Sequence, residues 1–233
     1  MTFTSLASSS RGNAYVVSDG ETTLLLECGL SFKELQKRLG YGVAGITACL
    51  VSHEHQDHAK AAAQLLKSGV PVYMSEGTAA AHKDAMDAAH LIKAGDVLRF
   101  GHLTVVPFRT FHNTDEPLGF LIEDRRTGER LLWAVDTANL GVTADKLTYI
   151  AVECNYEERL LNRSDRIPSV LKDRIRHSHF EVSDVIRWLH KQDLSGVLTI
   201  WLLHLSAGNS RAEAWQRRFE REFPGIEIRI CPE

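Results

Sequence analysis

The sequence predicts an α/β fold in which two β-sheets pack face to face and helices cover the outside. Three observations lead to this prediction. Short apolar strands alternate with helices before Val97, consecutive β-like segments follow between Val97 and Asp136, and 44% of the residues are hydrophobic, enough for a substantial core. The 233 residues contain no internal repeat and no Pro-, Gly- or Ser-rich linker, so we expect a single domain over residues 1–233.

Turn and capping signals place the elements of the first half. The pair Asp19-Gly20 lies between two apolar runs, which predicts a hairpin of strands 14–17 and 22–26. Ser31 and Glu34 have the spacing of a capping box that starts a helix, and Gly40 ends it. The other elements predicted here are strands at 3–6, 46–52 and 70–73, a polar loop at 8–13, and helices at 57–68 and from 77 to about 90.

The second half continues with β-structure and then alternates again. A turn at Arg126-Thr127-Gly128-Glu129 separates the last two segments of the β-rich stretch. Ser210 and Glu213 have the spacing of another capping box, which predicts a helix from Ser210 to about Phe223. The remaining predictions are strands at 97–100, 103–107, 108–111, 118–123, 130–135, 149–153, 197–205 and 226–230, and helices at 169–176 and 183–192.

Composition excludes several classes of protein. The 27 basic and 30 acidic side chains give a net charge of −3, which excludes a polybasic nucleic-acid arm. Any polyanion must therefore bind at a local site and not over the whole surface. No apolar run reaches 18 residues, and the N-terminus lacks the basic and apolar regions of a signal peptide, so we expect a cytoplasmic protein that does not engage a membrane. The scattered cysteines exclude a zinc ribbon and a disulfide framework: Cys28, Cys49, Cys154 and Cys231.

The strongest local signal is the hexapeptide His53-Glu54-His55-Gln56-Asp57-His58, between a predicted apolar strand and a predicted helix. Residues in a tight loop at the carboxyl end of a strand converge on one point. Imidazole and carboxylate donors at this density suit a borderline metal such as zinc. We therefore predict a metal site at this loop.

The H-x-H-x-D-H motif resembles that of the metallo-β-lactamase-fold hydrolases, whose fold is a four-layer αββα sandwich. Three more residues lie at predicted strand ends in the order of that family, namely His112, Asp136 and His204. The resemblance implies two divalent ions, zinc or alternatively manganese. One ion would be held by His53, His55 and His112, the other by Asp57, His58 and His204, with Asp136 bridging them. The turn Glu27-Cys28-Gly29 resembles the family's D-x-G turn, with glutamate in place of aspartate.

Smaller motifs resemble one branch, the YycJ/WalJ-like exonucleases, and behind it RNase Z. They are Ser9-Ser10-Arg11-Gly12-Asn13, Glu153-Cys154-Asn155-Tyr156-Glu157, Leu171-Lys172-Asp173-Arg174-Ile175 and His204-Leu205-Ser206-Ala207-Gly208-Asn209. The resemblance implies a nuclease that hydrolyses phosphodiester bonds, with DNA as its substrate. Asn13, Asn155 and Asn209 are its candidate substrate contacts.

Catalysis on a phosphodiester also needs a proton for the leaving alkoxide, and a histidine tuned near neutrality supplies it well. By resemblance to RNase Z-like enzymes, His179 is the candidate acid and Glu153 its orienting partner. His177 is a rival because the surrounding loop is shortened. Asp57 counts both as a ligand and as a catalytic residue.

Several alternatives stay open. The net charge of −3, with no protruding arm to grip a polymer, keeps a cyclic mononucleotide phosphodiesterase of the phage anti-Pycsar type in view. A small-ester or thioester hydrolase and a non-catalytic binding module of the same fold are further alternatives. We expect the arginines of the last predicted helix, Arg217, Arg218 and Arg221, to lie on a solvated face. By resemblance we expect a homodimer.

Overall fold

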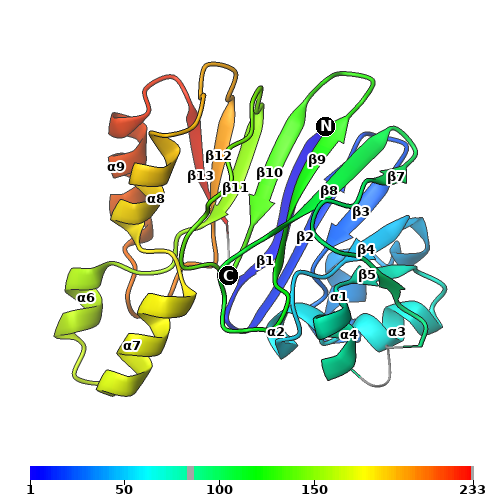
Figure 1. Cartoon of the computed structure of the whole chain (residues 1–233), viewed down its shortest axis with the longest axis horizontal. Helices are drawn as coiled ribbons and strands as arrows, with labels where there is room; N and C mark the ends of the chain where they lie inside the picture. Colours follow the sequence, from blue (N-terminus) through cyan, green and yellow to red (C-terminus); the bar gives the residue numbers. More distant parts are fainter. Residues whose placement is uncertain (83–86, 232–233) are drawn as a thin grey trace. The chain divides into compact units, whose positions relative to one another are not determined.

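The computed structural model describes residues 1–82 and 87–231 and divides into two compact units (Figure 1). Unit 1 comprises Met1–Arg109 and Thr114–Glu129, and unit 2 comprises Thr110–Asn113 and Arg130–Cys231. The single domain over residues 1–233 stays a prediction. Strands and helices occur in both units, as predicted for an α/β chain.

Unit 1 carries a six-stranded sheet in the order β1-β2-β3-β4-β5-β6. Its strands are β1 (Thr2–Ser9), β2 (Gly12–Ser18), β3 (Thr23–Leu26), β4 (Ala48–Leu50), β5 (Val72–Met74) and β6 (His90–Leu91). The first three pair antiparallel and the last four pair parallel, so β3, β4, β5 and β6 end at one edge of the sheet. Residues 8–13, predicted as a loop, instead form the tight end of the β1–β2 hairpin, with Ser9 opposite Gly12.

Unit 1 also contains the antiparallel strands β7 (Leu98–Phe100), β8 (Leu103–Arg109) and β9 (Leu118–Asp124). Strand β8 ends at Arg109, so the strand predicted to run to Phe111 was placed two residues too far. The predicted turn after β9 forms, because the amide of Gly128 donates to the carbonyl of Asp124.

Helices α1 (Phe32–Arg38), α2 (Gln56–Ala59), α3 (Ala62–Lys67) and α4 (Glu76–Ala81) belong to unit 1, with a 3-10 turn η1 (Val43–Gly45). Helix α1 starts as predicted, with the amide of Glu34 donating to Ser31 Oγ over 3.3 Å. The helix predicted at 57–68 was wrong in one respect, since it is interrupted between α2 and α3. The amide of Ala61 donates to the carbonyl of Cys28 instead of that of Asp57, which breaks the helical ladder.

The helix predicted from residue 77 to about 90 ends at Ala81, and its residues 83–86 lie outside the described part of the chain. His82 leaves helical geometry, and its Nε2 lies 2.7 Å from the carbonyl oxygen of Glu54. His90 begins strand β6 and is therefore not helical.

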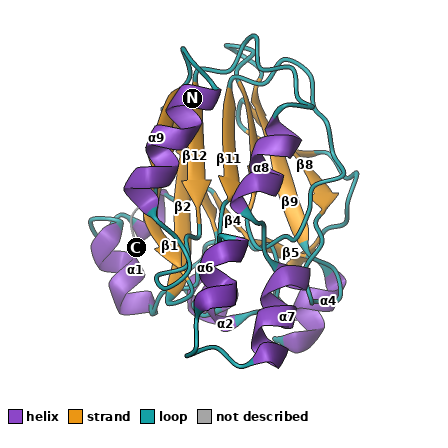
Figure 2. Cartoon of the chain, turned by 90° about the vertical axis from the view of Figure 1, so that its left-hand side faces the viewer, coloured by secondary structure: helices purple, strands orange, loops and turns teal. Residues whose placement is uncertain are grey.

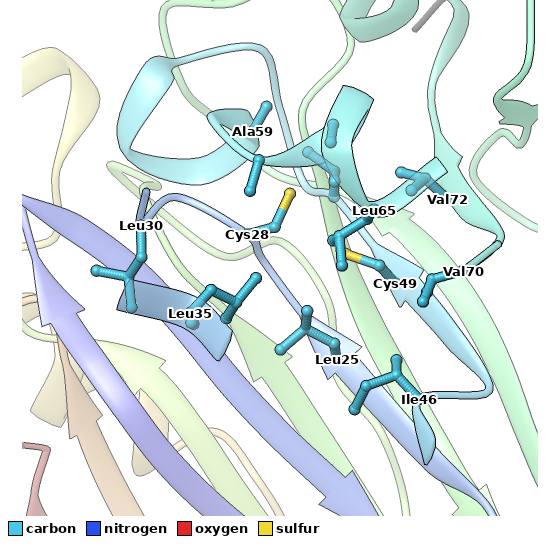
Figure 3. Close-up of a cluster of buried hydrophobic side chains, with 14 of the residues drawn as sticks. Leu25, Cys28, Leu30, Leu35, Ile46, Cys49, Ala59, Leu65, Val70 and Val72 are labelled. Carbon is cyan, nitrogen blue, oxygen red and sulfur yellow. The ribbon is translucent and has the colours of Figure 1, made fainter. Parts of the chain in front are cut away.

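Strands β3, β4 and β5 pack against α1 and α3 to make the core of unit 1 (Figure 3). Leu25 and Val72 come from the strands, Leu35 from α1 and Leu65 from α3, and all four are buried. Burial of side chains of this size stabilises the folded chain by about 1.5–3 kcal/mol each. This core supports the strand ends at which the loop with His53 begins.

Unit 2 is built on four parallel strands in the order β13-β12-β11-β10. They are β10 (Arg130–Ala134), β11 (Tyr149–Glu153), β12 (Thr199–Leu203) and β13 (Glu227–Ile230). The helices are α6 (Glu158–Arg163), α7 (Ser169–Ser178), α8 (Val182–Leu189) and α9 (Ala212–Glu222). Helices α8 and α9 lie against the strands, while α6 and α7 lie together beyond their ends (Figure 2). The apolar faces of α8 and α9, with Trp188 and Phe219 among their residues, are buried.

The structure of unit 2 differs from the predictions at two helices. Helix α6 was not predicted, because residues 158–163 offer only Leu160 and Leu161 as apolar residues in a charged segment. The capping box at Ser210 was wrong: the helix starts at Ala212, and its N-cap residue, Arg211, makes no side-chain capping bond.

Candidate metal centre

Unit 1 brings four of the predicted ligands together, and we call His53, His55, Asp57 and His58 the loop set. They follow β4 and run into α2, where β4 ends inside the sheet. His53 Nε2 lies 3.0 Å from His55 Nδ1, and His58 Nε2 lies 3.4 Å from Asp57 Oδ2. The four side chains thus converge from one short stretch of chain.

Buried groups around the loop set hold His53 and His58 in place. Glu27 is fully buried, with Oε2 3.1 Å from His58 Nδ1 and Oε1 accepting the amide of Ser52 over 2.9 Å. Burial raises the pKa of Glu27, although its bonds to His58 and Ser52 act in the opposite direction. Ser52 Oγ lies 2.8 Å from His53 Nδ1. Partners of this kind fix the orientation of ligating imidazoles and leave Nε2 for a metal. The glutamate that replaces the family's aspartate therefore still reaches its histidine.

The turn that carries Glu27 also lies directly against the start of α2. The amide of Cys28 donates to the carbonyl of His58 over 2.7 Å. A Cβ on Gly29 would lie 1.6 Å from the carbonyl oxygen of Asp57, so no other residue fits there without displacing the loop.

Unit 2 brings together a second group, which we call the assembled set: His112, Asp136, Glu153, His179 and His204. Asp136 follows β10, Glu153 ends β11 and His204 follows β12. Because these strands are parallel neighbours, their carboxyl ends meet at one edge of the sheet. His204 Nδ1 lies 2.8 Å from Asp136 Oδ1, and His112 Nε2 lies 3.5 Å from Asp136 Oδ2. The sheet thus assembles residues that are far apart in the sequence.

Glu153 is the buried centre of the assembled set. Its Oε1 lies 2.6 Å from His179 Nδ1 and 3.2 Å from His204 Nδ1. Burial opposes ionisation, yet the two histidines outweigh it and lower the pKa of Glu153. Burial likewise lowers the pKa of His204, but the carboxylates of Asp136 and Glu153 prevail and raise it to about 10. Two buried carboxylates therefore draw positive charge to this edge of the sheet.

His179, rather than its rival His177, is the histidine that reaches Glu153. It is the C-cap residue of α7, and the Glu153 carboxylate raises its pKa although burial works against this. His177 is exposed and directs its Nδ1 to the carbonyl of Asp173 over 2.7 Å.

Three residues of this chemistry also have an unusual backbone. Glu27, Asp136 and His204 have φ angles of 65°, 46° and 52°, values that residues other than glycine seldom adopt. Glu27 and His204 directly follow β3 and β12, and Asp136 lies two residues beyond the end of β10, so the left-handed turn redirects the chain at each strand end. Such conformations cost about 1–3 kcal/mol and cluster at functional sites.

The donor groups suit divalent ions. In the assembled set, ligand atoms of Asp136, Glu153, His179 and His204 all lie within 4.8 Å of one another. Imidazole nitrogens and carboxylate oxygens are ligands for zinc, manganese and iron alike. The donors therefore indicate a divalent metal ion and leave its identity open.

The three asparagines that were candidate substrate contacts are buried. The Asn13 amide donates to the carbonyls of Ser9 and Asp57 and lies 3.2 Å from His58 Nε2. Asn155 Nδ2 donates to the carbonyl of His204, and Asn209 Nδ2 donates to Ser206 Oγ. Asn13 and Asn155 brace the two sets, while contact of any of the three with substrate stays a prediction.

Sequence reasoning missed the backbone groups that complete the assembled set. The amides of Thr137 and Phe180 donate to Glu153 Oε2 over 2.7 and 3.3 Å, and the carbonyl of Ser178 lies 2.7 Å from His112 Nδ1. Main-chain atoms leave no trace in residue identity, so no sequence signal could have found them.

Comparison with known proteins decides the family. Residues 22–200 match the beta-lactamase superfamily domain. The chain belongs to this superfamily. The exodeoxyribonuclease YycJ of Bacillus anthracis is 30% identical over 229 residues, covering 91% of this chain and 84% of that protein. The exodeoxyribonuclease WalJ of Streptococcus pneumoniae is 26% identical over 230 residues, covering 89% and 82%.

A solved structure confirms the predicted fold. The metallo-β-lactamase fold protein YhfI of Bacillus subtilis matches 99% of this chain over 96% of its own, with a TM-score of 0.73 and 17% identity. The superfamily match and the 30% identity to YycJ make the chain a metallo-β-lactamase-fold hydrolase that acts on ester bonds, and its histidine and aspartate clusters imply divalent metal cofactors. Within the described residues, none of the helices has the length and apolar content of a membrane span.

Proposed function

We propose that the chain is a binuclear metal-dependent phosphodiesterase, and specifically a nuclease that removes nucleotides from DNA. The observation that carries the proposal is the Glu153–His179 pair, joined over 2.6 Å beside Asp136 and His204. A hydrolase that must protonate an alkoxide leaving group needs such a pair next to its ligands. The two exodeoxyribonucleases, which match over most of their length, support DNA as the substrate.

The seven proposed ligands are the loop set together with His112, Asp136 and His204. When bound, two divalent ions would supply a hydroxide nucleophile at neutral pH and stabilise the charge on the phosphate. Zinc is our first expectation and manganese the second. Glu27 and Ser52 hold the imidazoles of His58 and His53 in the orientation that leaves Nε2 for ligation.

The role proposed for His179 follows from its hydrogen bond. Because Nδ1 faces the carboxylate of Glu153, the proton on Nε2 is the one available to the leaving oxygen. Glu153 stabilises the imidazolium before transfer and is a positioning residue. Its second oxygen is held by the amides of Thr137 and Phe180, so it cannot turn away from His179 without losing two bonds.

A cyclic mononucleotide phosphodiesterase is the second candidate, and the net charge of −3 favours it. A polymer is held by many contacts between cationic side chains and phosphates, whereas one small nucleotide needs few. The same ligands and the same acid would serve either substrate.

A substrate panel tests both candidates. Linear DNA, RNA, cyclic AMP, cyclic UMP and a lactone are offered to the protein loaded with zinc or with manganese. We expect DNA to be degraded from its ends, and an Asp136→Ala variant to be inactive on every substrate that the native protein hydrolyses. Hydrolysis of the cyclic nucleotides without degradation of DNA would replace the first candidate by the second. Hydrolysis of the lactone alone would favour a small-ester hydrolase.

Metal analysis separates an enzyme from a binding module of the same fold. Protein purified without added metal is expected to contain about two equivalents of divalent metal, because the donor groups of all seven proposed ligands are present. A folded protein with almost no metal would contradict the proposal. The homodimer and the cytoplasmic location stay predictions, and light scattering of the purified protein tests the first.

A further inference from the structure

Between Glu157 and Ser178, unit 2 makes an excursion that we call the α6–α7 hairpin. Its two ends are fastened side by side: the amide of Asn155 donates to the carbonyl of Phe180, and that of Val182 donates to the carbonyl of Tyr156, both over 2.9 Å. The chain leaves soon after Glu153 and returns at His179. The two ends of the hairpin are therefore close in sequence to Glu153 and His179. Helices α6 and α7 lie side by side in both views (Figures 1 and 2).

The hairpin is braced internally by Arg176. Its guanidinium contacts the carboxylate of Glu158 over 2.9 Å, Asp173 over 2.7 Å and the amide oxygen of Asn162 over 2.7 Å. Leu161 of α6 is buried. These contacts join α6 to α7, so the hairpin holds its shape and presents its other side chains outward.

The hairpin carries a local excess of basic side chains. Residues 157–178 contain six lysines and arginines against four acids, in a chain whose net charge is −3. Four of the arginines are exposed, and within residues 1–82 and 87–231 their guanidinium groups make no ion pair or hydrogen bond. They are Arg159, Arg163, Arg166 and Arg174.

Helix geometry groups two of these arginines. Arg159 and Arg163 are four residues apart on α6 and therefore share one face. The arginines of α9 offer a contrast, because Arg217 faces Glu213 at 3.7 Å and Arg218 donates to Ser183 Oγ. Within the described residues, the four exposed arginines of the hairpin are thus unpaired and available to an external anion, whereas Arg217 and Arg218 of α9 have partners within the protein.

We propose that the α6–α7 hairpin grips the sugar–phosphate backbone of a DNA strand and delivers it to the Glu153–His179 pair. This inference rests on the proposed nuclease function and deepens it. A mononucleotide carries one phosphate and cannot engage four separate guanidinium groups, whereas a strand presents phosphates at regular intervals. Local charge on the hairpin thereby compensates for the acidic balance of the whole chain, and it favours the polymer over the cyclic nucleotide.

Exposed apolar side chains suggest a competing occupant. Val170 and Leu171 on α7 are 80% and 43% exposed, and such residues also suit contact with a second copy of the chain. Charge decides between the two occupants, because four unpaired arginines on one hairpin would disfavour a second copy across a symmetric interface but attract a polyanion.

The test removes the four free charges and compares two substrates. The variant R159Q/R163Q/R166Q/R174Q is assayed on single-stranded DNA and on bis(p-nitrophenyl) phosphate, a diester too small to reach the hairpin. We expect kcat/KM for DNA to fall at least about tenfold more than kcat/KM for the small diester. The slope of log Kd against log salt for DNA should also decrease by about 3, since each phosphate contact on a single strand contributes about 0.7.

Two control variants make the result specific. R217Q/R221Q removes two exposed charges from α9. It should change the ratio of kcat/KM for DNA to kcat/KM for the small diester less than twofold. Replacing the same four hairpin arginines by lysine keeps the charge and should retain most of the salt slope. Circular dichroism of each variant confirms folding. If the fourfold glutamine variant is unstable, R159Q/R163Q keeps the inference testable, because it removes only the two charges of α6 and should still lower kcat/KM for DNA more than kcat/KM for the small diester.

The outcomes separate this inference from the function on which it rests. Native protein that hydrolyses neither DNA nor the small diester with zinc or manganese would overturn the proposed function. Native protein that degrades DNA equally well with and without the four arginines would overturn the hairpin inference alone. So would a glutamine variant that changes oligomeric state in light scattering while its KM for DNA stays the same, because the hairpin would then be a contact between copies.

Discussion

The loop set and the assembled set are built in opposite ways. The loop set takes its donors from six consecutive residues after one strand, so chain connectivity keeps them close together. The assembled set takes its donors from five separate segments, and only the parallel order of β10, β11 and β12 brings Asp136, Glu153 and His204 to one edge. A motif can therefore identify the first set, whereas the second depends on the fold.

The supports of the two sets differ in the same sense. A neighbouring turn supports the loop set. In that turn, Gly29 packs against the backbone of Asp57, and Glu27 lies beside His58. The assembled set is held from within, because Glu153 joins His179 and His204. Substitutions at the turn should act on stability and metal affinity, and those within the assembled set should act on turnover.

The largest effect is expected when a proposed ligand of each set is removed. Asp136→Ala and His53→Ala should each lower kcat/KM on a phosphodiester by about a thousandfold or more, because loss of metal-based stabilisation costs several kcal/mol. Steady-state assays measure this, with the exposed Asp145→Ala as the control. If Asp136→Ala keeps its activity while His53→Ala loses it, the loop set works alone and the comparison fails.

Loss of the proposed acid should come next. His179→Ala is expected to lower turnover of DNA by about 100- to 10,000-fold, the usual contribution of a general acid. The loss should be much smaller on bis(p-nitrophenyl) phosphate, because its leaving group departs without a proton. His177→Ala is the matched control and should retain turnover, since His177 is exposed and faces the carbonyl of Asp173. Equal losses for both substrates would show that His179 does not donate the proton.

A third substitution tests the support of the loop set. In Gly29→Ala the new methyl group would collide with backbone atoms of Asp57 and His58, so we expect a loss of about 3 kcal/mol or more in the free energy of unfolding. Urea denaturation measures it, and Gly45→Ala is the control, because nothing lies within 4 Å of that position. Unchanged stability of Gly29→Ala would mean that the turn and α2 are not in close contact.

The smallest effect is expected from a change of charge beside His58. Glu27→Gln retains an oxygen for the amide of Ser52 but removes the carboxylate, so metal affinity should fall by about 10- to 100-fold. Competition with a chelator measures the affinity, and the free energy of unfolding of the metal-free protein serves as the control for folding. Native affinity in Glu27→Gln would exclude Glu27 as a support of the metal loop.

Elements with strong local signals were predicted well. Helix α1 starts at its predicted cap because Ser31 accepts the amide of Glu34, and β11 has its predicted bounds. Prediction failed where distant contacts decide. The helix after His58 is interrupted because Ala61 bonds to Cys28, and α6 depends on Arg176, which lies 18 positions from its partner Glu158.

The sequence by itself predicted the α/β fold class and a metal site at the loop set, because these depend on residue type, short spacing and local periodicity. The candidate ligands His112, Asp136 and His204 followed from the resemblance to a family of hydrolases. Only the tertiary structure decided that His179 and not His177 meets Glu153, that backbone amides hold that carboxylate, and that four arginines of the α6–α7 hairpin have no partner among the described residues. The physical reason is the range of the interactions. Local signals act over a few residues, whereas a buried carboxylate is satisfied by whatever groups the sheet brings within about 3 Å.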